Sequence, residues 1–284
     1  MENKYRAELV GVFGDPVDDN PTIAMMEAGF RELGLFYRYI TVRVCAEDLG
    51  SAMEGMRAFH MRGVNLTMPH KVSVLPYLDE LSPAARIIGA VNTVVRRGDM
   101  LFGDNTDGKG FMTAVQKAGF QPEGKQIAVL GAGGAARAIC VELALAGVGH
   151  ITVFNRNEAR GASLAHVLNE KTNTEASYQK WEGHAAIPDG TDLIVNATSI
   201  GMPGSGETKP AVDFSSVARG TLAADVVFLP ETPFLKEAAA HGAITADGLG
   251  MLVYQGAIAF ELWTGHAAPL ETMHAAIKTA FGLK

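Results

Sequence analysis

Two residues that can carry a proton stand in short polar segments of the first half of the chain. Lys71 ends the segment Asn65-Leu-Thr-Met-Pro-His-Lys71, and Asp107 lies in Gly103-Asp-Asn-Thr-Asp-Gly108. A lysine that is partly withdrawn from water beside a carboxylate can exchange a proton with a bound hydroxyl group. Taken alone, Lys71 also fits the surface of a helix's first turn, and Asp107 also fits a helix N-cap.

A glycine-rich loop further along predicts a dinucleotide site. Gly131, Gly133 and Ala136 match G-x-G-x-x-G/A directly after an expected strand at 126–130, and they open an expected helix at 134–146. A tight turn, a close backbone approach and a helix N-terminus together can hold a pyrophosphate. The expected cofactor positions in this loop are Gly131, Ala132, Gly133, Gly134 and Ala135. A proton-exchanging pair and a hydride carrier are what alcohol oxidation or ketone reduction requires.

The residues after the next expected strand bear on the identity of the nucleotide. In dinucleotide-binding βαβ units, an acidic residue at that position binds the ribose 2′-hydroxyl of NAD, and an arginine accommodates the 2′-phosphate of NADP. Here the chain reads Asn155-Arg156-Asn157-Glu158, with Arg160 close behind. The two arginines favour NADP and Glu158 favours NAD, although an ordinary solvated helix start is a simpler reason for the arginines. The sequence therefore predicts NAD or NADP, with neither preferred.

Composition narrows the classes of partner. The chain has 24 Lys and Arg against 31 Asp and Glu, a net charge of −7, which argues against nucleic acid. We find no apolar run long enough to cross a bilayer and no signal core at the N-terminus. The two cysteines, Cys45 and Cys140, have no metal-type spacing. We expect a cytoplasmic protein, monomeric or homodimeric, that requires no metal and binds a small molecule.

Hydrophobic periodicity predicts an α/β fold. Short apolar runs alternate with helix-period stretches, as in βαβ units around a mostly parallel sheet. We expect strands at 9–13, 36–44, 63–67, 91–96, 100–102, 126–130, 150–154, 192–196 and 222–225. We expect helices at 22–33, 49–59, 106–119, 134–146 and 157 to about 169, and only helices from residue 248 on. The glycine-rich loop 201–210 looks the most flexible.

Six ordered segments resemble signatures of the shikimate/quinate dehydrogenase family, and together they span nearly the whole chain. Beside the three segments already quoted, these are Gly89-Ala-Val-Asn-Thr93, Asn196-Ala-Thr-Ser-Ile-Gly-Met202 and Asp247-Gly-Leu-Gly-Met-Leu-Val-Tyr-Gln255. The resemblance implies two α/β domains. A substrate domain would comprise residues 1–106 and 248–284, with the C-terminal helices returning to it, and an NAD(P)-binding Rossmann domain would comprise 107–247.

The resemblance also implies roles for single residues. It makes Lys71 and Asp107 the catalytic pair and requires no metal. The implied substrate-binding positions are Asn65, Thr67, Asn92 and Gln255, for which hydrogen bonding within turns and strand ends is the simpler alternative. The further implied cofactor positions are Ala197, Thr198, Ser199, Val227, Gly248 and Met251.

The chain departs from the family pattern where the substrate should bind. Members that use shikimate usually carry S-x-S-P after the first strand, and its hydroxyls hold the substrate carboxylate. Here Gly14-Asp-Pro-Val-Asp-Asp-Asn-Pro21 is two residues shorter and lacks serine, and Asp18 and Asp19, beside Asn20, stand near that position. Two like charges about 4 Å apart repel by about 4 kcal/mol at an effective dielectric of 20. Phe228 also replaces a family tyrosine expected near the substrate.

These departures predict an NAD(P)-dependent alcohol dehydrogenase or ketone reductase that is not optimised for shikimate. Its substrate would be a shikimate- or quinate-like cyclic polyol, or the ketone of one, either lacking the carboxylate or carrying an amine. One alternative is an authentic shikimate dehydrogenase of aromatic amino acid biosynthesis that binds the substrate carboxylate through other residues. Another alternative is an NAD(P)-binding regulator without turnover. A third possibility is that Asp18 and Asp19 cap a helix and point away from the substrate.

Overall fold

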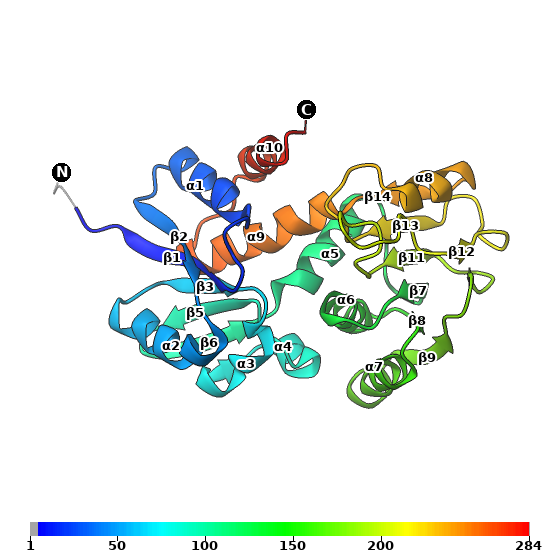
Figure 1. The fold of residues 1–284 in the computed structure, drawn as a ribbon, viewed down its shortest axis with the longest axis horizontal. Helices are drawn as coiled ribbons and strands as arrows, with labels where there is room; N and C mark the ends of the chain where they lie inside the picture. Colours follow the sequence, from blue (N-terminus) through cyan, green and yellow to red (C-terminus); the bar gives the residue numbers. More distant parts are fainter. Residues whose placement is uncertain (1–4, 284) are drawn as a thin grey trace. The chain divides into compact units, whose positions relative to one another are not determined.

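The chain folds into two compact α/β units, as the computed structural model of residues 5–283 describes them (Figure 1). The first unit contains the chain up to Thr106 and again from Val253 onward, and the second unit is Asp107–Leu252. Each unit is built on a six-stranded sheet. The predicted α/β class, with C-terminal helices in the first unit, is confirmed.

The first sheet has the strand order β2-β1-β3-β5-β6-β4. Its strands are β1 (Glu8–Gly14), β2 (Tyr37–Arg43), β3 (Gly63–Leu66), β4 (Glu80–Leu81), β5 (Thr93–Arg97) and β6 (Met100–Asp104). Strand β1 pairs in parallel with β2 and β3, whereas β5 runs antiparallel to β3 and β6. The carboxyl ends of β1 and β3 therefore share one edge of the sheet.

Backbone contacts at that edge place the loop after β1 against the segment after β3. The amide of Thr67 donates to Phe13 O at 3.0 Å, and the amide of Asp15 donates to Met68 O at 2.9 Å. A Cβ atom on Gly14 would lie 2.2 Å from Cγ2 of Thr67. A side chain at position 14 would therefore force the two segments apart, which explains the glycine.

Helices from both ends of the chain enclose the first unit. They are α1 (Thr22–Glu32), α2 (Leu49–Ala58), α3 (His70–Ser73), α4 (Pro83–Ile88), the later part of α9 (Gly248–Thr264) and α10 (Leu270–Ala280), with 3₁₀ turns η1 (Ala46–Asp48) and η2 (Leu75–Tyr77). Figure 1 shows α10, in red, beside α1, in blue. Phe260 of α9 stacks on Phe30 with ring centroids 5.2 Å apart, and Trp263 Nε1 donates to Val94 O at 3.0 Å. The C-terminal segment thus completes the core of the first unit.

The second sheet is wholly parallel, in the order β14-β13-β11-β7-β8-β9. Its strands are β7 (Gln126–Leu130), β8 (His150–Asn155), β9 (Glu175–Lys180), β11 (Leu193–Asn196), β13 (Leu222–Asp225) and β14 (Ile244–Ala246), and its helices are α5 (Thr106–Lys117), α6 (Gly134–Leu145), α7 (Glu158–Lys171) and α8 (Pro233–Ala240). The short strands β10 (Ala185–Ala186) and β12 (Val212–Asp213) pair separately. When these six strands are renumbered in chain order, their order across the sheet is that of the dinucleotide-binding fold. That fold takes its ligand at the carboxyl ends of the strands, here between β7 and β11.

The described residues, 5–283, contain no helix that combines the length and apolarity needed to cross a membrane. Within the same range no three His, Cys, Asp or Glu side chains gather in a metal-binding group. Cys45 and Cys140 are both free thiols, and burial raises the pKa of Cys140 to about 12.

Candidate functional site

Asn65 lies near the carboxyl end of β3, and both halves of its buried amide are hydrogen-bonded. The hydroxyl of Tyr39 donates to Asn65 Oδ1 at 2.9 Å. Asn65 Nδ2 in turn donates to Asn92 O at 3.2 Å and to Thr93 Oγ1 at 3.1 Å. An amide oxygen has two lone pairs, so Asn65 Oδ1 retains one with which to accept from a bound hydroxyl.

Asn92 connects three segments of the first unit. Its Nδ2 donates to Thr106 Oγ1 at 3.0 Å and lies 3.5 Å from Gln255 Oε1. Its Oδ1 accepts from the backbone amide of Thr106 at 2.7 Å. The structure therefore brings together three of the expected substrate positions, Asn65, Asn92 and Gln255, and Thr67 follows β3 on the same edge. It adds Tyr39, Thr93 and Thr106, which the sequence did not single out.

Replacing Tyr39 by phenylalanine should loosen this network. Burial raises the pKa of the Tyr39 hydroxyl well above its usual value, so the group remains a neutral donor. Its loss leaves a buried acceptor on Asn65 unpaired, which should lower the free energy of unfolding by about 1–3 kcal/mol. We also expect a higher KM for the substrate, because Asn65 is no longer fixed. Chemical denaturation and steady-state kinetics measure the two effects.

Tyr37→Phe is the matched control for this variant. Tyr37 lies on the same strand as Tyr39, β2. Its hydroxyl donates to Trp263 O at 3.3 Å and not to Asn65. Tyr37→Phe should leave KM unchanged. Equal KM values for the two variants would show that Tyr39 has no positioning role.

Lys71 lies in the short helix α3, just after Pro69, and is half-buried. Its carbonyl accepts from the amide of Val91 at 2.8 Å, which ties α3 to the residues before β5. Its neighbour His70 begins the helix and is fully buried, with Nε2 2.7 Å from Val44 O. His70 thus anchors α3 and fixes the backbone that carries Lys71.

Asp107 occupies the first turn of α5. It follows Thr106, whose amide and hydroxyl both bond to Asn92. Two earlier residues of the same motif, Asp104 and Asn105, are also hydrogen-bonded. Asp104 Oδ1 accepts from Ser82 Oγ at 2.5 Å and from the amide of Asn105 at 2.8 Å. Hydrogen bonds therefore hold the segment 104–107 at the start of α5. The sequence indicated this segment through the motif Gly103–Gly108, which contains Asp107.

The loop after β1 presents two acidic side chains to solvent. Asp18 and Asp19 are exposed, on a turn closed by the bond from Asn20 N to Val17 O at 3.1 Å. Asn20 Oδ1, and neither aspartate, accepts from the amide of Thr22 at 3.0 Å at the start of α1. Asp15 in the same loop is paired with Arg43 at 2.8 Å. Arg43, which also feels the charge of Asp18, is thus one positive charge against three carboxylates, so the loop keeps a net negative charge.

The glycine loop of the second unit has the geometry of a phosphate cradle. Gly131 follows β7 with φ +108°, a conformation that favours glycine, and a Cβ there would lie 3.0 Å from Ala197 O. The space in front of Gly133 and Gly134 is open, since a Cβ on either would have no neighbour within 4 Å. Ala136 is fully buried against the sheet. The first turn of α6, with half-buried Ala132 and Ala135 beside the glycines, can therefore accept a pyrophosphate.

The five expected polar positions, from the last residue of β8 to Arg160, form a capped and charged turn. Asn155 Nδ2 donates to Asn157 O at 2.7 Å, and Asn157 Oδ1 caps α7 by accepting from the amide of Arg160 at 3.0 Å. Glu158 and Arg160 are exposed in the first turn of α7. Arg156 points instead to Glu207, with which it forms two hydrogen bonds of 2.8 and 2.6 Å.

The carboxyl ends of β11 and β13 are joined by a buried hydrogen-bond group. Asp225 accepts from Asn196 Nδ2 at 2.9 Å, Thr232 Oγ1 at 2.6 Å and the amide of Val227 at 3.0 Å. Burial raises the pKa of Asp225, and these bonds oppose that shift. A Cβ on Gly248 would lie 2.5 Å from Val227 O. The start of α9 therefore packs directly on the two residues after β13, Val226 and Val227.

The remaining expected positions of this unit lie around that group. Thr198 Oγ1 donates to Asn196 Oδ1 at 2.7 Å. Ala197 is buried beside Gly131, and Ser199 is exposed. Met251 is buried in α9, and Phe228 is half-buried. Ala197, Val227 and Gly248 thus lie at strand ends on the edge where the glycine loop begins.

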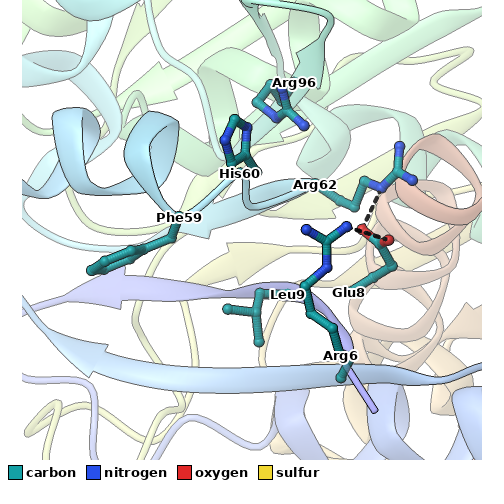
Figure 2. A pocket seen from close by; sticks show the side chains of 8 residues that line it. Arg6, Glu8, Leu9, Phe59, His60, Arg62 and Arg96 are labelled. Carbon is teal, nitrogen blue, oxygen red and sulfur yellow. Dashed lines mark hydrogen bonds and ion pairs between the residues drawn. The ribbon is translucent and has the colours of Figure 1, made fainter. Parts of the chain in front are cut away.

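A basic hollow of about 290 Å³ lies at the opposite edge of the first sheet (Figure 2). Arg62 Nε donates to Glu8 Oε2 at 2.8 Å, and Arg6 approaches Glu8 Oε1 at 4.0 Å. His60 and Arg96 lie across from this pair in Figure 2. Strands β1 and β3 begin here, whereas the Asn65 network lies where β3 ends. The hollow is therefore separate from the Asn65 network.

Comparison with known proteins covers nearly the whole chain. The family model of the shikimate dehydrogenase substrate binding domain matches residues 12–94, that of shikimate/quinate 5-dehydrogenase matches 113–204, and that of the shikimate 5′-dehydrogenase C-terminal domain matches 248–278. The shikimate dehydrogenase (NADP(+)) of Desulforamulus reducens is 44% identical over 94% of each chain.

Two solved structures illustrate the range of relatives. The ligand-free 5-ketofructose reductase of Gluconobacter sp. strain CHM43 is 45% identical, with a TM-score of 0.94 over 97% of this chain and 99% of that one. Shikimate 5-dehydrogenase of Listeria monocytogenes, in complex with shikimate and NAD, is 36% identical, with a TM-score of 0.88 over 96% and 97% of the two chains. The structural similarity therefore extends to enzymes named for different substrates.

Proposed function

The chain belongs to the shikimate/quinate dehydrogenase family, and from this premise we propose that it reduces a keto group of an uncharged, polyhydroxylated sugar of the 5-ketofructose kind. It is an NAD- or NADP-dependent oxidoreductase that acts on a CH–OH group. We assign the substrate to the first unit, with Lys71 and Asp107 as the proton-transfer pair, and the nucleotide to the second.

The loop after β1 carries this choice of substrate. It has no serine to hold a carboxylate, and it sets Asp15 and the exposed Asp18 and Asp19 against the single cation Arg43. A carboxylate ligand would meet like charge there, whereas a sugar hydroxyl can donate to these carboxylates or to Asn20. The 45% identity to a reductase named for 5-ketofructose, which has no carboxyl group, supports the same choice.

The second unit fits a dinucleotide. Open space before Gly133 and Gly134, the left-handed Gly131 and the free first turn of α6 suit a pyrophosphate. Asn155 to Arg160 would hold the adenosine ribose. Ala197, Thr198, Ser199, Val227, Gly248 and Met251 would flank the nicotinamide half. NAD(P) supplies the hydride when it is bound.

The protein's own groups supply the proton and the orientation. The ammonium of Lys71 donates a proton to the carbonyl oxygen as it becomes a hydroxyl, and the carboxylate of Asp107 orients Lys71 and shares the proton. Asn65, Asn92 and Gln255 bind neighbouring hydroxyls through hydrogen bonds of their side-chain amides. Thr67 and Phe228 border the substrate, one polar and one apolar.

A second candidate is shikimate itself, supported by the 44% identity to a shikimate dehydrogenase. That activity needs a cationic or hydroxyl group for the carboxylate, and the Asp18–Asp19 turn offers neither. A regulator that binds NAD(P) without turnover is a third candidate. The presence of both Lys71 and Asp107 opposes it, since a regulator has no need of a proton pair.

A substrate panel tests the proposal. We would assay 5-ketofructose, 3-dehydroshikimate and 3-dehydroquinate as oxidants, with NADH and NADPH, by nicotinamide absorbance. We expect the highest kcat/KM for the keto-sugar. Efficient turnover of 3-dehydroshikimate with none of the keto-sugar would contradict the proposal, and binding of NAD(P) with no turnover of any compound would favour the regulator.

A further inference from the structure

Arg156, which the fold places where an adenosine ribose would bind, is already bound to a carboxylate of the protein. Its Nη1 and Nη2 donate to Glu207 Oε2 and Oε1 at 2.8 and 2.6 Å. Paired bonds of this kind use the two-pronged face of the guanidinium, which is also the face that arginine offers to a phosphate. Glu207 therefore occupies the donors that a 2′-phosphate would need.

Neighbouring residues hold this ion pair in place. The Arg156 guanidinium lies 5.3 Å from the ring centroid of Trp181, and the buried Trp181 donates from Nε1 to Gly183 O and Ala211 O. The carbonyl of Glu207 accepts from Gly201 N at 3.0 Å and from Ser205 Oγ at 2.8 Å. The backbone of loop 201–210 is thus held where the Glu207 carboxylate reaches Arg156.

Both partners stay charged around neutral pH. The hydrogen bond with Arg156 lowers the pKa of Glu207, and the same bond raises the pKa of Arg156. A 2′-phosphate entering this turn would have to displace a carboxylate, or share the arginine with it at the cost of like-charge repulsion. A 2′-hydroxyl would require neither change, because it can accept or donate without disturbing the pair.

We propose that Glu207 sets the nucleotide preference, by acting as an internal replacement for the 2′-phosphate on Arg156. With NAD bound, the Arg156–Glu207 pair persists. With NADP bound, the phosphate takes Arg156, aided by the exposed Arg160, and Glu207 is released. Glu207 thus lowers the advantage of NADP and lets one site accept both nucleotides. This inference rests on the proposed placement of the adenosine at residues 155–160.

Calorimetry with nucleotide fragments tests Glu207 without any catalytic step. The ligands are adenosine 2′,5′-bisphosphate, which carries the 2′-phosphate, and 5′-AMP, which does not. Glu207→Gln should lower the Kd of the bisphosphate by roughly fivefold, which corresponds to the upper range for an exposed ion pair. It should leave the Kd of 5′-AMP within a factor of about two of the wild-type value. Glu207→Ala should give the same shift. In the Arg156→Gln background, Glu207→Gln should give no gain.

Glu170→Gln is the matched control. Glu170 lies in α7, and its carboxylate pairs with Lys171, not with Arg156, so the variant removes the same charge without touching the turn. It should change neither affinity. An unchanged ratio of the two affinities in both Glu207 variants, with the protein folded and binding both fragments, would overturn the role of Glu207 alone. Failure of the wild-type protein to bind either fragment, NAD or NADP would overturn the proposed function as well.

Discussion

Lys71→Met should lower kcat/KM for the keto substrate by about 10²–10⁴-fold, the usual contribution of a positioned acid or base, while NAD(P) binding stays intact. The methionine keeps much of the length and apolar stem of lysine but cannot donate a proton. Asp107→Asn should also lose most activity, because its amide cannot take up the proton or carry charge. Steady-state kinetics gives the loss, and nucleotide titration shows whether the cofactor still binds.

A matched control guards against a general effect of the substitution. Lys117→Met removes an exposed lysine from the last turn of α5 and should leave kcat/KM within about twofold, as expected of a surface change. Losing both catalytic groups should cost little more than losing one, because residues that act as a unit are not additive. Full turnover by Lys71→Met would remove Lys71 from the proton-transfer step.

Neutralising the loop after β1 should improve the use of carboxylate substrates. We expect Asp18→Asn with Asp19→Asn to raise kcat/KM for shikimate by about tenfold or more, because a pair of like charges about 4 Å apart costs up to about 4 kcal/mol at a dielectric of 20 and exposure reduces this. Turnover of the keto-sugar should fall slightly or stay constant. High salt should narrow the difference between the variant and the wild-type protein.

The control for this variant removes two acidic charges elsewhere in the same unit. Glu32 and Glu54 are exposed on α1 and α2, away from the Asp18–Asp19 turn in the sequence. Glu32→Gln with Glu54→Gln should leave shikimate turnover unchanged. An equal gain in the two double variants would show that net charge, and not the turn, sets the preference.

The regular parts of the fold were predictable because their signals are local. The glycine loop between an apolar strand and a helix marked β7 and α6, and the capping residue Asn20 followed by Pro21 marked the start of α1. Strand β9 was missed because it lies at the edge of its sheet and its sequence, Glu175–Lys180, is mostly polar. Helix α8 was missed although Thr232 and Pro233 carry the standard start signals.

The candidate site was only partly accessible from sequence. Motifs pointed to Asn65, Asn92 and Gln255, whose side chains the structure joins in one network. Tyr39 stands outside these motifs and reaches Asn65 only because β2 and β3 flank β1 in one parallel arrangement. The pairing of Arg156 with Glu207, which are 51 positions apart, likewise depends on a loop conformation that no local pattern encodes.

Helix α9 belongs to both units, since its first residues pack on Val227 and its last turns carry Phe260 and Trp263 into the other core. A protein ending at residue 247 would retain every strand of both sheets yet expose Phe30 and leave the carbonyl of Val94 without its indole donor. Exchanging nucleotide modules between relatives must therefore graft the continuous internal segment 107–252, with junctions inside α5 and α9. A simple swap of front and back halves would instead build the first unit from two different proteins, because that unit contains both ends of the chain.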